Sequence, residues 1–137
     1  MSLELHLKIT GALLIVLGLA HSSFDRYFEW EKDLATAPLL TRQVFLAHCF
    51  FISLAVVLMG TCTLCYAGAL VHSGFLSRIV LTGFAVFWLA RWFFQLFFYD
   101  PAIWRGNAFY TSMHVVFSVF WTYIVVVYVA ALKLAYA

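Results

Sequence analysis

The sequence carries little charge. Of its 137 residues, 8 are Lys or Arg and 6 are Asp or Glu, so charged residues make up 10% of the chain. A water-soluble domain needs roughly 25% to cover its surface. This chain therefore lacks the charged surface of a soluble protein. No basic run is present, so the sequence also predicts no nucleic-acid partner.

Several catalytic signatures are absent as well. The chain has no glycine-rich phosphate loop, no HExxH and no Ser/His/Asp spacing typical of a hydrolase. These absences argue against hydrolytic and nucleotide-dependent enzymes. Only three cysteines occur, Cys49, Cys62 and Cys65, which are too few for a disulfide framework.

What the sequence does contain is long, unbroken apolar stretches, and 66% of its residues are hydrophobic. In lipid, every backbone polar group must be satisfied within the protein, so a membrane-spanning chain forms helices or a closed barrel. The unbroken stretches select helices. We expect an all-α, polytopic membrane protein in which residues 1–137 form a single domain, an antiparallel four-transmembrane-helix bundle that contacts the lipid bilayer.

The predicted helices are separated by polar stretches. An interfacial helix is expected within residues 22–40, between the first two spans, with Tyr27 and Trp30 as anchors. Pro101 ends the third span, because proline disfavours helical geometry in the preceding residue. The four spans are expected over residues 5–21, 39–65, 76–99 and 108–134.

Polar side chains are expected to meet near one end of these spans. A charge such as Arg91 costs at least about 2.5 kcal/mol at the centre of a bilayer, so it needs a partner inside the protein. Gln95 lies one helical turn later on the same face, which Trp88 and Tyr99 extend. We expect Arg91 to hold an anionic or carbonyl group, or the carboxylate of Asp25 or Asp100, as its partner.

Three histidines are predicted to lie in the same layer. His48 and His114 are each roughly 10 Å into their helices at a rise of 1.5 Å per residue, and His21 ends the first helix. Three imidazoles from three helices could bind a transition metal (zinc, copper or iron) with an open fourth position. His21, His48 and His114 are therefore candidate metal ligands.

Two other ligands suit the same layer. A haem would take two of the histidines as axial ligands and pair a propionate with Arg91. A quinone or other isoprenoid would bond its head group to a histidine and to Arg91 or Gln95, with its tail among phenylalanines. Trp88, Arg91, Gln95 and Tyr99 are thus the candidate cofactor-binding residues, and redox or electron-transfer chemistry is the predicted role. A hydrogen-bonded network that only locks the bundle is a further alternative.

Two competing functions stay open. Cys62-Thr63-Leu64-Cys65 is a CxxC motif, which could act in a thiol oxidoreductase. The chain could instead be a non-catalytic accessory subunit whose aromatic helices contact a homo-oligomer or a larger membrane complex. The sequence thus leaves open whether the protein is an enzyme or a subunit of a membrane oxidoreductase.

The plan resembles the DoxX-like small four-span bacterial membrane proteins. The resemblance rests on the Gly11 to Gly18 seam followed by His21, and on four short spans within 137 residues. It implies a bacterial inner-membrane protein, and some members of the group are subunits of quinone-linked oxidoreductases. The density of basic residues in the short loops favours both termini in the cytoplasm.

Overall fold

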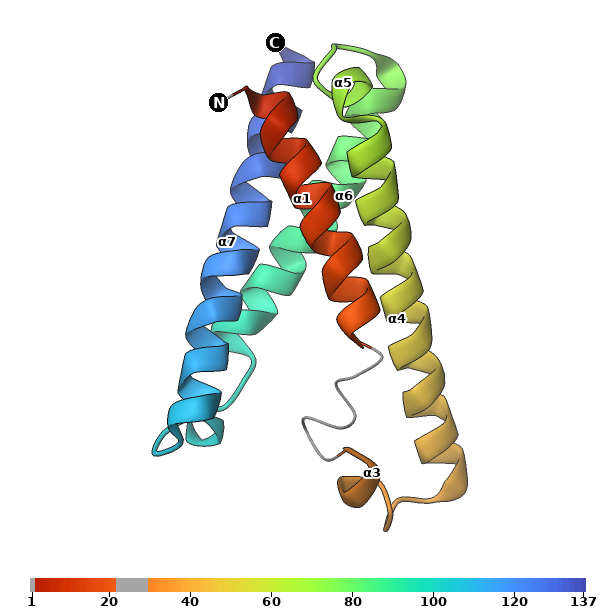
Figure 1. Cartoon of the computed structure of the whole chain (residues 1–137), viewed down its shortest axis with the longest axis vertical. Coiled ribbons are helices and arrows are strands. Elements are labelled where there is room, and N and C mark those ends of the chain that lie inside the picture. Colours follow the sequence, from red (N-terminus) through yellow and green to blue (C-terminus); the bar gives the residue numbers. More distant parts are fainter. Residues whose placement is uncertain (1, 22–29) are drawn as a thin grey trace. The chain divides into compact units, whose positions relative to one another are not determined.

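A computed structural model describes residues 2–21 and 30–137, and every regular element within them is a helix (Figure 1). Four of the described helices are long and apolar enough to cross a membrane. They are α1 (Leu3–Ala20), α4 (Leu39–Cys65), α6 (Phe75–Phe97) and α7 (Ala108–Tyr136). The prediction of an all-α, polytopic integral membrane protein is confirmed.

Three short helices connect the long ones. They are α3 (Trp30–Asp33), α5 (Ala67–Leu70) and the 3-10 turn η2 (Pro101–Ile103). The predicted interfacial helix falls partly on residues 22–29, which lie outside the described residues, so it stays a prediction beyond α3.

Polar side chains mark where η2 and α7 begin. Before η2, the Asp100 carboxylate accepts a hydrogen bond from the backbone N–H of Ala102 at 2.8 Å. Before α7, Asn107 Oδ1 accepts from the N–H groups of Phe109 and Tyr110 at 3.0 and 3.2 Å. Both side chains satisfy backbone donors that a helix start leaves unpaired.

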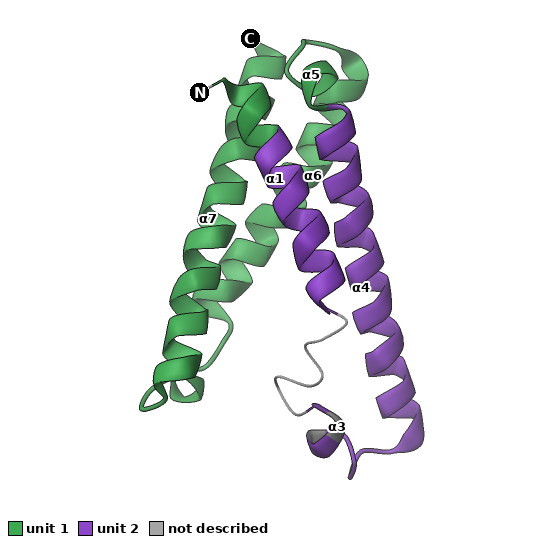
Figure 2. Cartoon of the chain, viewed as in Figure 1, with its two compact units in different colours: residues 1–7, 67–137 green, residues 8–66 purple. Residues whose placement is uncertain are grey.

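The chain divides into two compact units (Figure 2). Unit 1 comprises residues 1–7 and 67–137, and unit 2 comprises residues 8–66. The prediction of a single domain over residues 1–137 stays a prediction.

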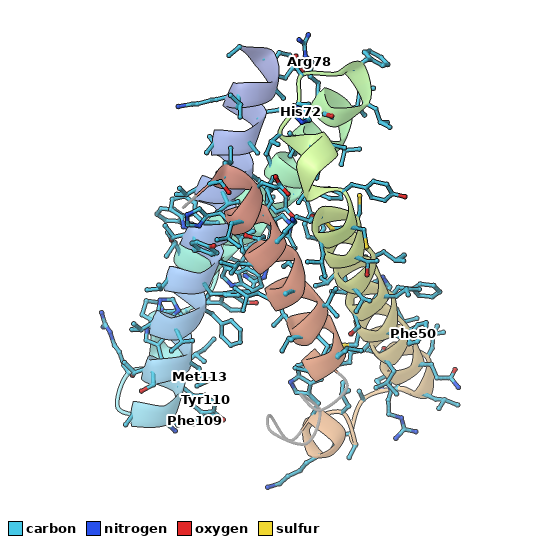
Figure 3. All side chains as sticks on the ribbon, turned by 45° about the horizontal axis from the view of Figure 1, so that its top comes forward. Phe50, His72, Arg78, Phe109, Tyr110 and Met113 are labelled. Carbon is cyan, nitrogen blue, oxygen red and sulfur yellow. The ribbon has the colours of Figure 1, made fainter. Side chains whose placement is uncertain are left out.

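Unit 1 is built on the packing of α6 against α7. Aromatic rings fill this interface: Phe84 meets the buried Tyr128 edge to face, with ring centroids 5.6 Å apart. At one end of the unit, Arg78 Nε donates to the carbonyl of Ala135 at 2.9 Å. Figure 3 shows Arg78 at that end and Phe109 at the opposite end of the unit.

Unit 2 is held together by glycines where α1 crosses α4. A Cβ on Gly11 would come within 2.6 Å of the backbone nitrogen of Leu64, and one on Gly60 within 2.8 Å of the Gly11 carbonyl. A Cβ on Gly18 would meet Ser53 O at 3.0 Å, so the two helices run antiparallel. Glycine is required at Gly11 and Gly60 because the two backbones come into contact there.

Six hydroxyl groups on α4 and α7 bond back to the backbone of their own helix. Each donates to the carbonyl four residues earlier, at 2.7–2.9 Å. The donors are Ser53, Thr61, Thr63, Ser112, Ser118 and Thr122. The hydrogen-bonding needs of these hydroxyl groups are thus met within their own helix.

Candidate functional site

The predicted polar face of α6 meets α7 at a side-chain hydrogen bond. Trp88, Arg91 and Gln95 follow one another at helical steps of three and four, so they share a face. Gln95 is only 6% exposed, and its Nε2 lies 3.0 Å from Nδ1 of His114. The structure therefore brings together two of the residues predicted for the polar layer.

His114 is also covered by an indole. The ring of Trp104 stacks on the imidazole with centroids 3.9 Å apart and an interplanar angle of 14°. Thr111 Oγ1 donates to the carbonyl of Trp104 at 2.7 Å, which fixes the segment after η2. The sequence offers no signal for this contact, because the segment that carries Trp104 has no periodicity from which its path can be inferred.

Arg91 has aromatic rings as its neighbours. Its Cζ lies 4.8 Å from the ring centre of Trp121 and 5.9 Å from that of Tyr99, within cation–π range. Its Nη1 is buried and finds no acceptor among the described residues. The carboxylate of Asp100 is engaged by Ala102, and Asp25 lies outside the described residues. The expected carboxylate partner is thus not seen in the described part of the chain.

Two indole N–H groups near Arg91 are likewise buried without an acceptor among the described residues. Trp88 and Trp121 stack with ring centroids 5.2 Å apart at 17°, and neither buried Nε1 has an acceptor within the described ranges. By contrast, Trp92 Nε1 on the same helix donates to Thr122 Oγ1 at 2.9 Å. We call Arg91 Nη1, Trp88 Nε1 and Trp121 Nε1 the donor cluster. Buried donors are nearly always paired in proteins. Three unpaired N–H groups in one cluster are therefore unusual, and an oxygen-bearing ligand could supply the acceptors.

The hydrogen bond of His114 decides what its other nitrogen can do. If Gln95 Nε2 donates, Nδ1 is the acceptor and the ring proton sits on Nε2, which then has no lone pair for a metal. If the amide is turned, Oε1 accepts from Nδ1–H and Nε2 becomes a ligand nitrogen. Metal binding by His114 thus requires the second arrangement.

The other two predicted metal ligands, His21 and His48, lie in unit 2. Their Nδ1 atoms bond to the carbonyls of Leu17 at 3.0 Å and Val44 at 2.7 Å, which leaves the lone pair on Nε2. Among the described residues, no group of three His, Cys, Asp or Glu side chains is placed to hold a metal ion. The site formed by His21, His48 and His114 stays a prediction.

Unit 2 also contains a hollow of about 440 Å³ between α1, α3 and α4. Its lining is largely apolar and includes Phe50 and Trp30, while His21, Cys49 and Ser53 add polar groups. The volume suits a small apolar ligand or part of a lipid chain, and His21 is the imidazole at its edge.

No protein-family model matches the chain, and no curated protein or solved structure matches it. The DoxX-like resemblance therefore stays a prediction.

Proposed function

We propose that this membrane protein binds the head group of a quinone-like isoprenoid at the donor cluster and serves a redox or electron-transfer process. The observation that carries the proposal is the set of three buried N–H donors on α6 and α7 with no acceptor among the described residues. A quinone supplies what they lack, because its ring carries carbonyl oxygens.

The character of the cluster favours an oxygen-bearing ligand over a cation. A guanidinium and two indoles offer only N–H donors and no lone pair for a metal. The positive charge of Arg91 also opposes a metal ion and stabilises a carbonyl or phenolate oxygen. The Trp88 and Trp121 rings stack on each other and are 1% and 4% exposed, so a head group would meet their N–H edges rather than their faces.

An isoprenoid tail finds apolar surface next to these donors. Phe94 and Phe98 lie on α6 and just beyond its end, with ring centroids 4.9 Å apart, and they are 48% and 69% exposed. An isoprenoid tail that lies over Phe94 and Phe98 would replace the contacts of these rings with lipid. The DoxX-like resemblance agrees with this ligand, since some members of that group are subunits of quinone-linked oxidoreductases.

Fluorescence titration in lipid nanodiscs tests the proposal. A short-chain benzoquinone should quench the tryptophan emission of the parent protein saturably, because two indoles line the site. Arg91→Met should weaken binding at least tenfold, the equivalent of one charge-assisted hydrogen bond. The matched control is Arg78→Met, which removes an arginine whose Nε already has an acceptor. Quenching that does not saturate, or that is equal in both variants, would refute the quinone.

Metal or haem binding is the second candidate, and the orientation of two histidines favours it. With Nδ1 bonded to a carbonyl, His21 and His48 present Nε2 as the ligand nitrogen, a common arrangement in metal sites. Elemental analysis should then find zinc, copper or iron that His48→Ala loses. A Soret band that shifts with dithionite would identify haem. Co-purification with a larger complex, free of any ligand, would favour the accessory-subunit function.

A further inference from the structure

The CxxC motif lies in an intact last turn of α4. Cys62 and Cys65 are both helical, α4 ends at Cys65, and the N–H of Tyr66 still donates to the carbonyl of Cys62 at 3.0 Å. Both thiols are free. The spacing of the two sulfurs is therefore governed by helix geometry.

Helix geometry distinguishes a disulfide from a bridging metal. Side chains three residues apart on a helix have Cβ atoms about 5–6 Å apart, whereas a disulfide needs about 3.5–4.5 Å. A metal ion bound to both sulfurs adds two bonds of about 2.3 Å and spans the wider gap. The helical CxxC thus suits a shared metal ion better than the disulfide of a thiol oxidoreductase.

The surroundings of the pair leave it accessible. α1 packs against α4 at Gly60 and Leu64, which lie on the opposite side of the helix from the two thiols at 100° per residue. Cys65 is exposed and Cys62 is half-buried. α4 has 27 residues and is about 40 Å long, so it exceeds the roughly 30 Å hydrocarbon layer. Its end therefore reaches the headgroup region, where ions and solvent protons have access.

The sulfur of a methionine lies three residues before the first cysteine of the CxxC motif. Met59 lies three residues before Cys62, so three sulfurs follow one another at Met59, Cys62 and Cys65 along neighbouring positions of the helix surface. Met59 is half-buried, and its thioether sits on a flexible side chain that can reach toward a neighbour. All three sulfur atoms are soft ligands.

We propose that Cys62 and Cys65, with Met59 as a weaker third ligand, form a copper(I) site at the end of α4. Soft thiolate and thioether ligands select copper(I), whereas zinc prefers four tetrahedral ligands. On binding, each thiol releases its proton to solvent, and the ion keeps its oxidation state. The site is independent of the quinone proposal and lies within unit 2.

Competition against a chromogenic copper(I) chelator tests the site. The full-length protein is reduced, freed of reductant without air, and titrated with copper(I) alone. One equivalent should bind to the parent chain. Cys62→Ser and Cys65→Ser should each weaken binding at least a hundredfold, and Met59→Leu about tenfold. Cys49→Ser is the control, because Cys49 lies on the same helix four turns away and should bind copper(I) as the parent does.

Two results would overturn the proposal. One is equal copper(I) affinity in all four variants. The other is a Cys62–Cys65 disulfide found by peptide mapping of protein isolated without reductant, which would make the pair a redox couple. A measurement on the unsubstituted chain guards against misfolded variants: one equivalent of phenylarsine oxide, which bridges neighbouring thiols, should abolish copper(I) binding. Persisting binding would equally contradict the site.

Discussion

The amide nitrogen of Gln95 lies 3.0 Å from Nδ1 of His114, which joins α6 to α7 by a bond between side chains. Gln95 is buried, so neither water nor lipid can replace the bond. One face of the imidazole is covered by the ring of Trp104. His114 is thus fixed from two directions by residues distant in the sequence.

Breaking this bond should destabilise the helix pair. Gln95→Leu keeps the volume of the side chain but leaves His114 Nδ1 without its partner, which should cost about 1–3 kcal/mol. Chemical unfolding in detergent micelles, followed by circular dichroism, measures the loss. His48→Ala is the control and should change stability by no more than about 0.5 kcal/mol, because His48 is exposed and its hydrogen bond within the described residues is to its own helix. Equal losses would mean that the inter-helix bond adds nothing.

Replacing the charge at Arg91 should stabilise the protein while removing its ligand. Arg91→Met relieves a cost of at least about 2.5 kcal/mol for a charge in the bilayer and gives up cation–π contacts worth about 0.5–2 kcal/mol. A net gain of about 1 kcal/mol is expected in the ligand-free protein, as at functional sites that trade stability for binding. Arg78→Met should instead lose stability, since its bond to Ala135 is broken. A loss at Arg91 as large as that at Arg78 would assign Arg91 a structural role.

The glycine contact in unit 2 should be intolerant of a methyl group. Gly60→Ala places a Cβ 2.8 Å from the Gly11 carbonyl and 2.9 Å from the nitrogen of Ile15, so α1 and α4 must separate. Overpacking of this kind costs about 1–3 kcal/mol. Gly83→Ala is the matched control, because nothing lies within 4 Å of its added Cβ. It should stabilise α6 by up to about 1 kcal/mol. Thermal unfolding of both variants separates the two effects, and equal shifts would count against the close approach.

The start of α7 should depend on one side chain. Asn107→Ala removes the acceptor for the N–H groups of Phe109 and Tyr110, which should cost about 1 kcal/mol. Asn107→Asp retains a capping oxygen and should restore most of that stability. Hydrogen exchange of the first turn of α7 reports the change locally. If the alanine variant exchanges there at the parent rate, the cap is dispensable.

The spans were predictable from the sequence because their signals are local. α4 begins after Pro38 and ends at Cys65, as predicted, and α7 begins at Ala108. The third helix begins at Phe75 and ends at Phe97, within two residues of the prediction. Apolar run length and helix-ending residues need no knowledge of neighbours. The helix α5 was missed, since four residues carry too little periodicity to separate a single turn from a loop.

The candidate site was predictable only in part, because it depends on how helices face one another. Helical steps placed Arg91 and Gln95 on one face, and the structure confirms that Gln95 meets His114. Periodicity does not say which residue of α7 faces Arg91, so the contact with the ring of Trp121 was not predicted. The expected pairing of Arg91 with Asp25 stays a prediction, because Asp25 lies outside the described residues. Whether the three histidines share a metal ion stays a prediction.

The back-bonded hydroxyls bear on how the chain enters a bilayer. Ser53, Thr61 and Thr63 are satisfied by the carbonyls of α4 itself, so that helix can cross hydrocarbon before any neighbour arrives. The amide of Gln95 finds its bond on α7 instead. A lone α6 would carry that group unpaired into lipid, at a cost of several kcal/mol. Since only residues 98–107 separate the two helices, insertion of α6 and α7 together as a hairpin avoids this cost.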